Sequence, residues 1–356
     1  METIRAAIVG CGRISDLHQL GYRGRADARI VAVCDPDQER AQHKARAWGV
    51  HKVYRDFDQV LNDREVDLVE LLTPHHLHCP MTVAACKAGK HVSVQKPMAL
   101  SAAQADEMIS AAQRAGVMLR VYENFVYYAP AVRARQMLEA GEIGEVWAIR
   151  MHVSTGTSDT SWEVPLSSWA WRFNEELCGG GPLVFDHGYH LFSLAHYLAG
   201  PVERVHAWID RTTVAPGTSI DAPAMVMFKH VAPRCYGVLD IEHTPEMRIV
   251  SDYYADDNRV EVIGAKGILF INRYTARTVD LPELMLFKDG KTSPVPVEGV
   301  EWHDSFVAAT QDLIEKLRHG GQARLDGPTG KAVLQFCLAA HESARTGREV
   351  CPGEVR

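Results

Sequence analysis

The stretch Ile8-Val9-Gly10-Cys11-Gly12-Arg13-Ile14-Ser15 joins a short apolar run to a segment suited to a helix. It matches the pattern G-x-G-x-x-G, in which glycines permit a tight turn and a close approach of backbone to a pyrophosphate, except that Ser15 takes the third small position. A helix beginning here offers free N–H groups to an anion. The stretch predicts a dinucleotide-binding turn, and an ordinary strand-to-helix turn is the alternative. The residues expected at the cofactor are Gly10, Gly12, Arg13 and Ile14.

The rest of the first 120 residues alternates short apolar runs with helical stretches. Strands are expected over residues 6–9, 30–34, 68–72, 91–94 and 118–121, and helices between them, for example over residues 37–48 and 102–115. This alternation is typical of a parallel sheet covered by helices on both faces.

After about Asn124 the pattern changes. Residues 146–153 alternate between apolar and polar side chains, and similar strand-like runs occupy residues 205–209, 224–228, 236–241, 260–263 and 268–271. Alternation of this kind indicates half-exposed antiparallel strands. We therefore expect an α/β N-terminal Rossmann domain over residues 1–124 and an α+β C-terminal domain with a large, mostly antiparallel open sheet over residues 125–356.

Composition narrows the class of protein. The 356 residues are 46% hydrophobic and carry 38 Lys and Arg against 45 Asp and Glu, a net charge of −7. The hydrophobic content is enough for a folded core, and the negative net charge argues against a surface that binds nucleic acid.

No apolar run approaches the roughly 20 residues of a membrane-spanning helix. Residues 1–5 lead directly into the first predicted strand without a secretion signal, and the eight cysteines form no C-x-x-C, so we expect reduced thiols and a cytoplasmic location.

The second predicted strand ends at Asp35, 23 residues after Gly12. A carboxylate at this place commonly binds the ribose 2′-hydroxyl of a dinucleotide and repels a 2′-phosphate. The sequence therefore favours NAD over NADP as cofactor. A solvated aspartate that opens a turn is the alternative.

A histidine-rich loop follows the strand at residues 68–72. Its residues Thr73, Pro74, His75 and His78 are expected to touch the dinucleotide, because this loop lies at the carboxyl edge of the sheet. A metal site is the alternative for the histidines, but neighbouring His75 and His76 generally diverge, so no metal is predicted.

The next strand delivers Gln95, Lys96 and Pro97 to the same edge. In a dry pocket, the Lys96 ammonium could hold a substrate oxygen and stabilise negative charge on it. A lysine on the surface is the alternative, because most lysines are exposed.

The stretch Gly179-Gly180-Gly181-Pro182-Leu183-Val184-Phe185-Asp186-His187-Gly188-Tyr189-His190 reads as a loop followed by a helix. Asp186 and His190 are four residues apart, which places both on one helical face where they could address one ligand, while His187 points elsewhere. A histidine can supply a base near neutral pH. A buried core histidine is the alternative.

Together, these motifs resemble the Gfo/Idh/MocA oxidoreductase family, the relatives of glucose-fructose oxidoreductase and inositol dehydrogenase. The likeness spans almost the whole chain, including Glu123-Asn124-Phe125 and Trp171-Arg172. One departure is Gln95, because the family usually has Glu before the Lys-Pro pair. The neutral Gln95 removes one carboxylate that would help to hold the charge of Lys96.

The resemblance implies an NAD-dependent oxidoreductase that transfers a hydride between a secondary alcohol of a sugar, sugar derivative or cyclitol and the nicotinamide. In that mechanism His190 takes the hydroxyl proton, Lys96 stabilises the alkoxide, and Asp186 binds a neighbouring hydroxyl and orients His190. The remaining implied contacts are Gln95, Lys96 and Asn124 with the cofactor, and Tyr128, Trp171, Arg172, Lys96, Asp186 and His190 with a small polyhydroxylated substrate.

The resemblance also implies a homodimer or homotetramer formed through the C-terminal sheet.

Two other functions stay open. One is a redox-neutral NAD-dependent glycosidase that oxidises, eliminates, hydrates and reduces. The other is a non-catalytic dinucleotide-binding regulator, because fold does not establish function.

Overall fold

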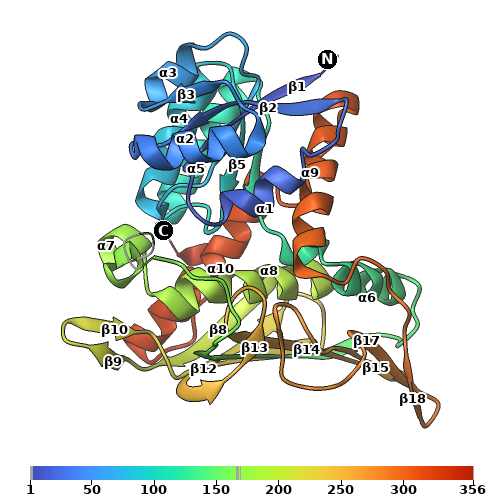
Figure 1. The fold of residues 1–356 in the computed structure, drawn as a ribbon. Coiled ribbons are helices and arrows are strands. Elements are labelled where there is room, and N and C mark those ends of the chain that lie inside the picture. The colour runs from blue at the N-terminus through green and yellow to red at the C-terminus, as the bar shows by residue number, and fades with distance from the viewer. Residues whose placement is uncertain (1–2, 166–167, 169, 356) are drawn as a thin grey trace.

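The computed structural model describes residues 3–165, 168 and 170–355, and its N-terminal part is built on a six-stranded parallel sheet (Figure 1). The strand order is β3-β2-β1-β4-β5-β6, so the order reverses between β1 and β4. At such a reversal the loops diverge and leave room for a ligand beyond the carboxyl ends of the strands. The bounds are β1 (Ile4–Val9), β2 (Ala28–Cys34), β3 (Lys52–Tyr54), β4 (Leu68–Leu71), β5 (His91–Gln95) and β6 (Leu119–Tyr122).

Helices join these strands, and local signals in the sequence delimit them. Asp37 caps α2 by accepting a hydrogen bond from the Arg40 backbone N–H, and Ser101 caps α5 in the same way. Side-chain caps satisfy backbone donors that the first helical turn leaves free. The helices of this part are α1 (Ser15–Leu20), α2 (Gln38–Trp48), α3 (Phe57–Asn62), α4 (His78–Lys87) and α5 (Ala102–Ala115).

The C-terminal part contains an eight-stranded sheet in the order β18-β17-β15-β14-β7-β12-β11-β8. Only β7 and β12 pair in parallel, so the expected mostly antiparallel sheet is confirmed. The strands are β7 (Val146–Thr157), β8 (Val202–Ile209), β11 (Ala224–His230), β12 (Tyr236–Arg248), β14 (Asp256–Gly264), β15 (Gly267–Ile271), β17 (Leu284–Lys288) and β18 (Lys291–Pro294). Two short antiparallel pairs accompany it: the hairpin of β9 (Thr212–Ala215) and β10 (Thr218–Ile220), and β13 (Val250–Ser251) with β16 (Ala276–Arg277), which are separated in the chain by β14 and β15.

The two faces of this sheet differ. Helices α6 (Ala129–Glu139), α8 (Gly188–Ala199) and α10 (Gly327–Thr346) pack on one face, between the two sheets (Figure 1). The opposite face, which we call the outer face, exposes Trp208, Met225, Met227, Tyr236 and Phe287. Within the described residues, no helix combines the length and apolar character that crossing a bilayer requires.

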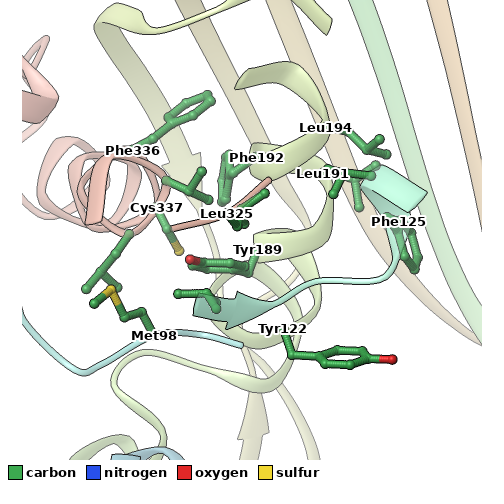
Figure 2. Packing of buried hydrophobic residues seen from close by; sticks show 14 of the residues in the cluster. Met98, Tyr122, Phe125, Tyr189, Leu191, Phe192, Leu194, Leu325, Phe336 and Cys337 are labelled. Atoms are coloured by element: carbon green, nitrogen blue, oxygen red, sulfur yellow. The ribbon is translucent and has the colours of Figure 1, made fainter. Parts of the chain in front are cut away.

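The C-terminal helices tie the two parts together. Leu313 and Ile314 of α9 (Trp302–His319) share a buried cluster with Ile4 of β1. Figure 2 shows Phe192 of α8 and Phe336 of α10 in the main core, which also contains side chains of the N-terminal part. A division of the chain after residue 124 stays a prediction, since α9 and α10 pack on both sides of it.

Candidate active site

The glycine turn predicted from the sequence follows β1. Gly10 has φ +97°, and a Cβ there would lie 2.4 Å from the Leu72 carbonyl oxygen. A Cβ on Gly12 would instead meet no atom within 4 Å, so this position borders open space. The buried Ser15 hydroxyl donates to the Gly12 carbonyl at 2.6 Å and closes the turn. Gly10 is thus required by packing, while Gly12 leaves room for a ligand.

Asp35 braces this turn from the end of β2. Its carboxylate accepts hydrogen bonds from the backbone N–H groups of Cys11 at 2.8 Å and Asp37 at 2.9 Å. An Arg40 guanidinium nitrogen lies 3.6 Å from the same carboxylate, a neighbour that the sequence pattern did not indicate. Arg13 extends from the turn over the ring of Trp162, 4.5 Å from its centroid, and Ile14 packs on the main core.

The histidines after β4 turn to different partners. Both ring nitrogens of the buried His78 face carbonyl oxygens, those of Pro97 at 2.8 Å and Thr73 at 2.9 Å. His75 places Nδ1 2.8 Å from the Cys178 carbonyl and Nε2 3.3 Å from the Asp186 carboxylate. His78 therefore joins two loops, and His75 belongs to a cluster around Asp186. Pro74 precedes the short helix that holds His75.

Asp186 lies at the centre of this cluster. Its carboxylate accepts a hydrogen bond from Lys96 Nζ at 2.8 Å and another from Arg172 Nε. The Asp186 backbone carbonyl accepts a second bond from Lys96 at 2.9 Å. Burial alone would raise the pKa of Asp186, but the charges of Lys96 and Arg172 hold it well below its usual range. The carboxylate therefore stays ionised and fixes the Lys96 ammonium.

The local backbone explains how Asp186 reaches Lys96. Residues Pro182–His187 form a π-helical turn before α8. The Asp221 carboxylate anchors its start by accepting from the N–H groups of Leu183 at 2.8 Å and Val184 at 2.7 Å. A Cβ on Gly181 would lie 2.2 Å from the Asp221 carboxyl carbon, so glycine is needed there.

His190 projects from the first turn of α8 toward Glu123 at the end of β6. Its Nδ1 lies 2.7 Å and 2.8 Å from the two Glu123 carboxylate oxygens, and Phe125 stacks on its ring with centroids 4.1 Å apart. Burial lowers the pKa of His190 to about 4; Glu123 opposes this shift and the charge of Lys96 adds to it. His190 is therefore neutral at pH 7.

The predicted contact between Asp186 and His190 is corrected by this geometry. Glu123 orients His190, while Asp186 holds Lys96 and Arg172. The four-residue spacing assumed an α-helix, but the π-helical turn has a longer repeat, which changes the direction of the Asp186 side chain.

Residues 4–123 match the model of an oxidoreductase family with an NAD-binding Rossmann fold, and residues 131–270 match the Gfo/Idh/MocA C-terminal domain. The chain belongs to the Gfo/Idh/MocA oxidoreductase family. It is 29% identical to D-apiose dehydrogenase of Paraburkholderia graminis, over 98% of this chain and 90% of that protein. It is 27% identical to myo-inositol 2-dehydrogenase of Thermotoga maritima, over 99% of each. A levoglucosan dehydrogenase solved with NADH and levoglucosan shares the fold, with a TM-score of 0.83, 21% identity and 99% of each chain covered.

Gln95, which departs from the usual Glu of this family, has two defined partners. Its Oε1 accepts a hydrogen bond from the Lys96 backbone N–H at 2.8 Å, and its Nε2 lies 3.1 Å from Nε2 of His18. His18 in turn places Nδ1 2.5 Å from the fully buried Glu70 carboxylate. A buried carboxylate is thus present behind Gln95, connected through an imidazole. No local pattern in the sequence indicates a role for His18 or Glu70, because their partners are distant in the chain.

The structure separates the other predicted contacts into two groups. Trp171 lies edge-on to His75 with centroids 4.6 Å apart, and the Arg172 guanidinium lies 4.5 Å from the Trp171 centroid, so both residues join the Asp186 cluster. Asn124 instead donates to the Ser305 hydroxyl, and Tyr128 is fully buried against Tyr274. In the described part of the chain, neither of these two side chains forms a hydrogen bond with Lys96, Asp186 or His190.

Proposed function

We propose that this chain oxidises a secondary alcohol of a sugar, sugar derivative or cyclitol with NAD and catalyses the reverse reduction. The observation that carries the proposal is the pairing of each candidate catalytic group with its own carboxylate: Lys96 with Asp186, and His190 with Glu123. An ammonium and a neutral imidazole held in this way suit an alcohol oxygen that loses a proton. The dehydrogenase activities named for the relatives agree with this reaction.

The first part of the chain fits a dinucleotide. Gly12 borders open space, and Asp35 stands at the end of β2 beside it. The Thr73 hydroxyl is buried and, among the described residues, has no hydrogen-bond partner. An unsatisfied buried hydroxyl beside the reversal of strand order is suited to a ligand hydrogen bond. We propose that these three residues hold NAD.

The residues of this chain would divide the alcohol chemistry between them. NAD, when bound, supplies the hydride acceptor. His190 Nε2 accepts the hydroxyl proton, and Lys96 donates a hydrogen bond to the same oxygen as it becomes a carbonyl. Asp186 holds the Lys96 side chain in place through a hydrogen bond. Arg172, whose guanidinium lies over the Trp171 ring, offers a planar donor to other substrate hydroxyls.

A direct spectrophotometric assay tests this function. NAD is incubated with a panel of aldoses, glycosides and cyclitols, and NADH is followed by absorbance, with the variants Lys96→Met and His190→Asn as controls. We expect one or more polyols to yield NADH, and each variant to lose about 10²- to 10⁴-fold in kcat. Absence of NADH with every polyol would refute the proposal. Release of an aglycone without net NADH would instead support the redox-neutral glycosidase, and binding without turnover would support a regulator.

We also propose that the outer face joins copies of this chain into a homodimer or homotetramer. Its exposed Trp208, Met225 and Tyr236 are large apolar or aromatic side chains of a kind enriched at interfaces. Light scattering during gel filtration tests this, and Trp208→Glu should favour the monomer.

A cytoplasmic location agrees with eight unpaired cysteines, seven of them buried.

A further inference from the structure

We propose that Glu123 is a positioning residue that sets the tautomer of His190 and balances the charge formed on that imidazole when it accepts a proton. The inference rests on the proposed function, because it assigns a role to a residue behind the proposed base. Glu123 was recognised in the sequence only as part of a short motif, without a role.

The geometry determines which nitrogen of His190 carries the hydrogen. Both Glu123 oxygens face Nδ1, at 2.7 Å and 2.8 Å, and an ionised carboxylate can only accept hydrogen bonds. Nδ1 is therefore the protonated nitrogen of the neutral ring, and Nε2 carries the lone pair. Within the described residues, no hydrogen bond engages Nε2, which leaves it available to a substrate hydroxyl.

Neighbouring groups hold the pair in this arrangement. Glu123 is 1% exposed, and its Oε1 also accepts from the Phe125 backbone N–H at 2.8 Å. The Phe125 ring then stacks on His190 with an interplanar angle of 11°. One short segment after β6 thus fixes the carboxylate by hydrogen bonding and the plane of the imidazole by stacking.

Electrostatics make this carboxylate most important when His190 is charged. Burial, Lys96 and His187 all disfavour a positive charge on His190, whereas Glu123 favours it. The Asp186 carboxylate already has Lys96 and Arg172 as partners. Glu123 is therefore the anion that directly contacts the imidazolium, and its stabilising effect increases as the proton arrives. An interaction that strengthens in this way raises kcat more than it lowers KM.

The variant Glu123→Gln tests the proposal through a double-mutant cycle with His190→Ala. An amide can also donate to Nδ1, which would place the hydrogen on Nε2 and disable the base. We expect kcat to fall about 10²- to 10⁴-fold while KM changes little. If Glu123 acts through His190, the double variant is no slower than His190→Ala alone. Glu123→Asp should recover part of the activity, because it retains a carboxylate.

Two controls separate this role from structural damage and from failure of the proposed function. Asp240→Asn alters another carboxylate–histidine pair, with His152 on the outer face, and should leave kcat unchanged. Nitrogen-15 NMR of His190 in the wild-type chain should show hydrogen on Nδ1 near pH 7, whether or not a substrate is known. Hydrogen on Nε2, or losses that multiply in the double variant, would overturn the inference. If the wild type oxidises a polyol and Glu123→Gln has the same kcat, the role of Glu123 is refuted while the proposed function stands. If the wild type oxidises no polyol, the proposed function itself is refuted.

Discussion

The two glycines of the first turn should respond in opposite ways to the same added methyl group. In Gly10→Ala the new Cβ would lie 2.4 Å from the Leu72 carbonyl oxygen and 2.8 Å from its carbon, and the backbone has φ +97°. A left-handed conformation costs about 1–2 kcal/mol for alanine, and relief of a backbone overlap costs roughly 1–3 kcal/mol more. We expect Gly10→Ala to lose about 2–5 kcal/mol in free energy of unfolding, measured by urea denaturation followed by fluorescence.

Gly12→Ala is the matched control for the fold and the direct test of cofactor binding. Its Cβ meets no atom within 4 Å, so the free energy of unfolding should change by less than about 1 kcal/mol. If the pyrophosphate of NAD approaches this backbone, the methyl group should cost roughly 1–3 kcal/mol of binding, which is about 5- to 150-fold in Kd. Titration of NAD by fluorescence measures this change. Unchanged affinity in Gly12→Ala would refute the assignment of the cofactor to this turn.

Three further predictions concern charged groups of the site. Asp35→Ser should shift the ratio of kcat/KM values for NADP and NAD at least about tenfold toward NADP, because it removes a carboxylate that repels a 2′-phosphate, while Arg40 stays beside the site with Asp37 as its partner; an unchanged ratio would contradict the role of Asp35. Asp186→Asn should destabilise the fold by about 3–5 kcal/mol, since Lys96 loses its buried counter-charge, and calorimetry that finds no change would contradict this. The pKa of His190 is about 4 in the folded chain, whereas a histidine of the unfolded chain has a pKa near 6.5. Between these two pH values the unfolded chain binds the proton and the folded chain does not, so the free energy of unfolding falls as the pH is lowered. From pH 7 to pH 5 the wild type should lose about 2 kcal/mol more than His190→Asn, and equal losses would disprove the shift.

The parts of the fold that the sequence predicted well are those with local signals. The five strands expected in the first 120 residues all occur, and α2 and α5 end at glycines in the left-handed conformation. The edge pair of β17 and β18 was not predicted, because all four residues of β18 are exposed and the strand lacks apolar alternation. Asp289 and Gly290, both with positive φ, form a turn signal that could have identified it.

The candidate site shows a similar limit. Position at the end of a strand identified Lys96 and Asp35, and a helical spacing identified Asp186 and His190. The spacing also led to a wrong partner for His190, since it could not reveal the π-helical turn. Glu123 has no periodicity that distinguishes it from other carboxylates, and only its contact with Nδ1 indicates a role.

The sequence by itself determined the parallel nucleotide-binding sheet, the antiparallel sheet after it and the residue types at the strand ends, because apolar periodicity and turn residues act over a few neighbouring positions. The tertiary structure alone decided which groups are paired. Lys96 meets Asp186 across 90 residues, and Glu123 meets His190 across 67. Such pairs depend on how β5, β6 and α8 pack against one another, and no local pattern specifies that packing.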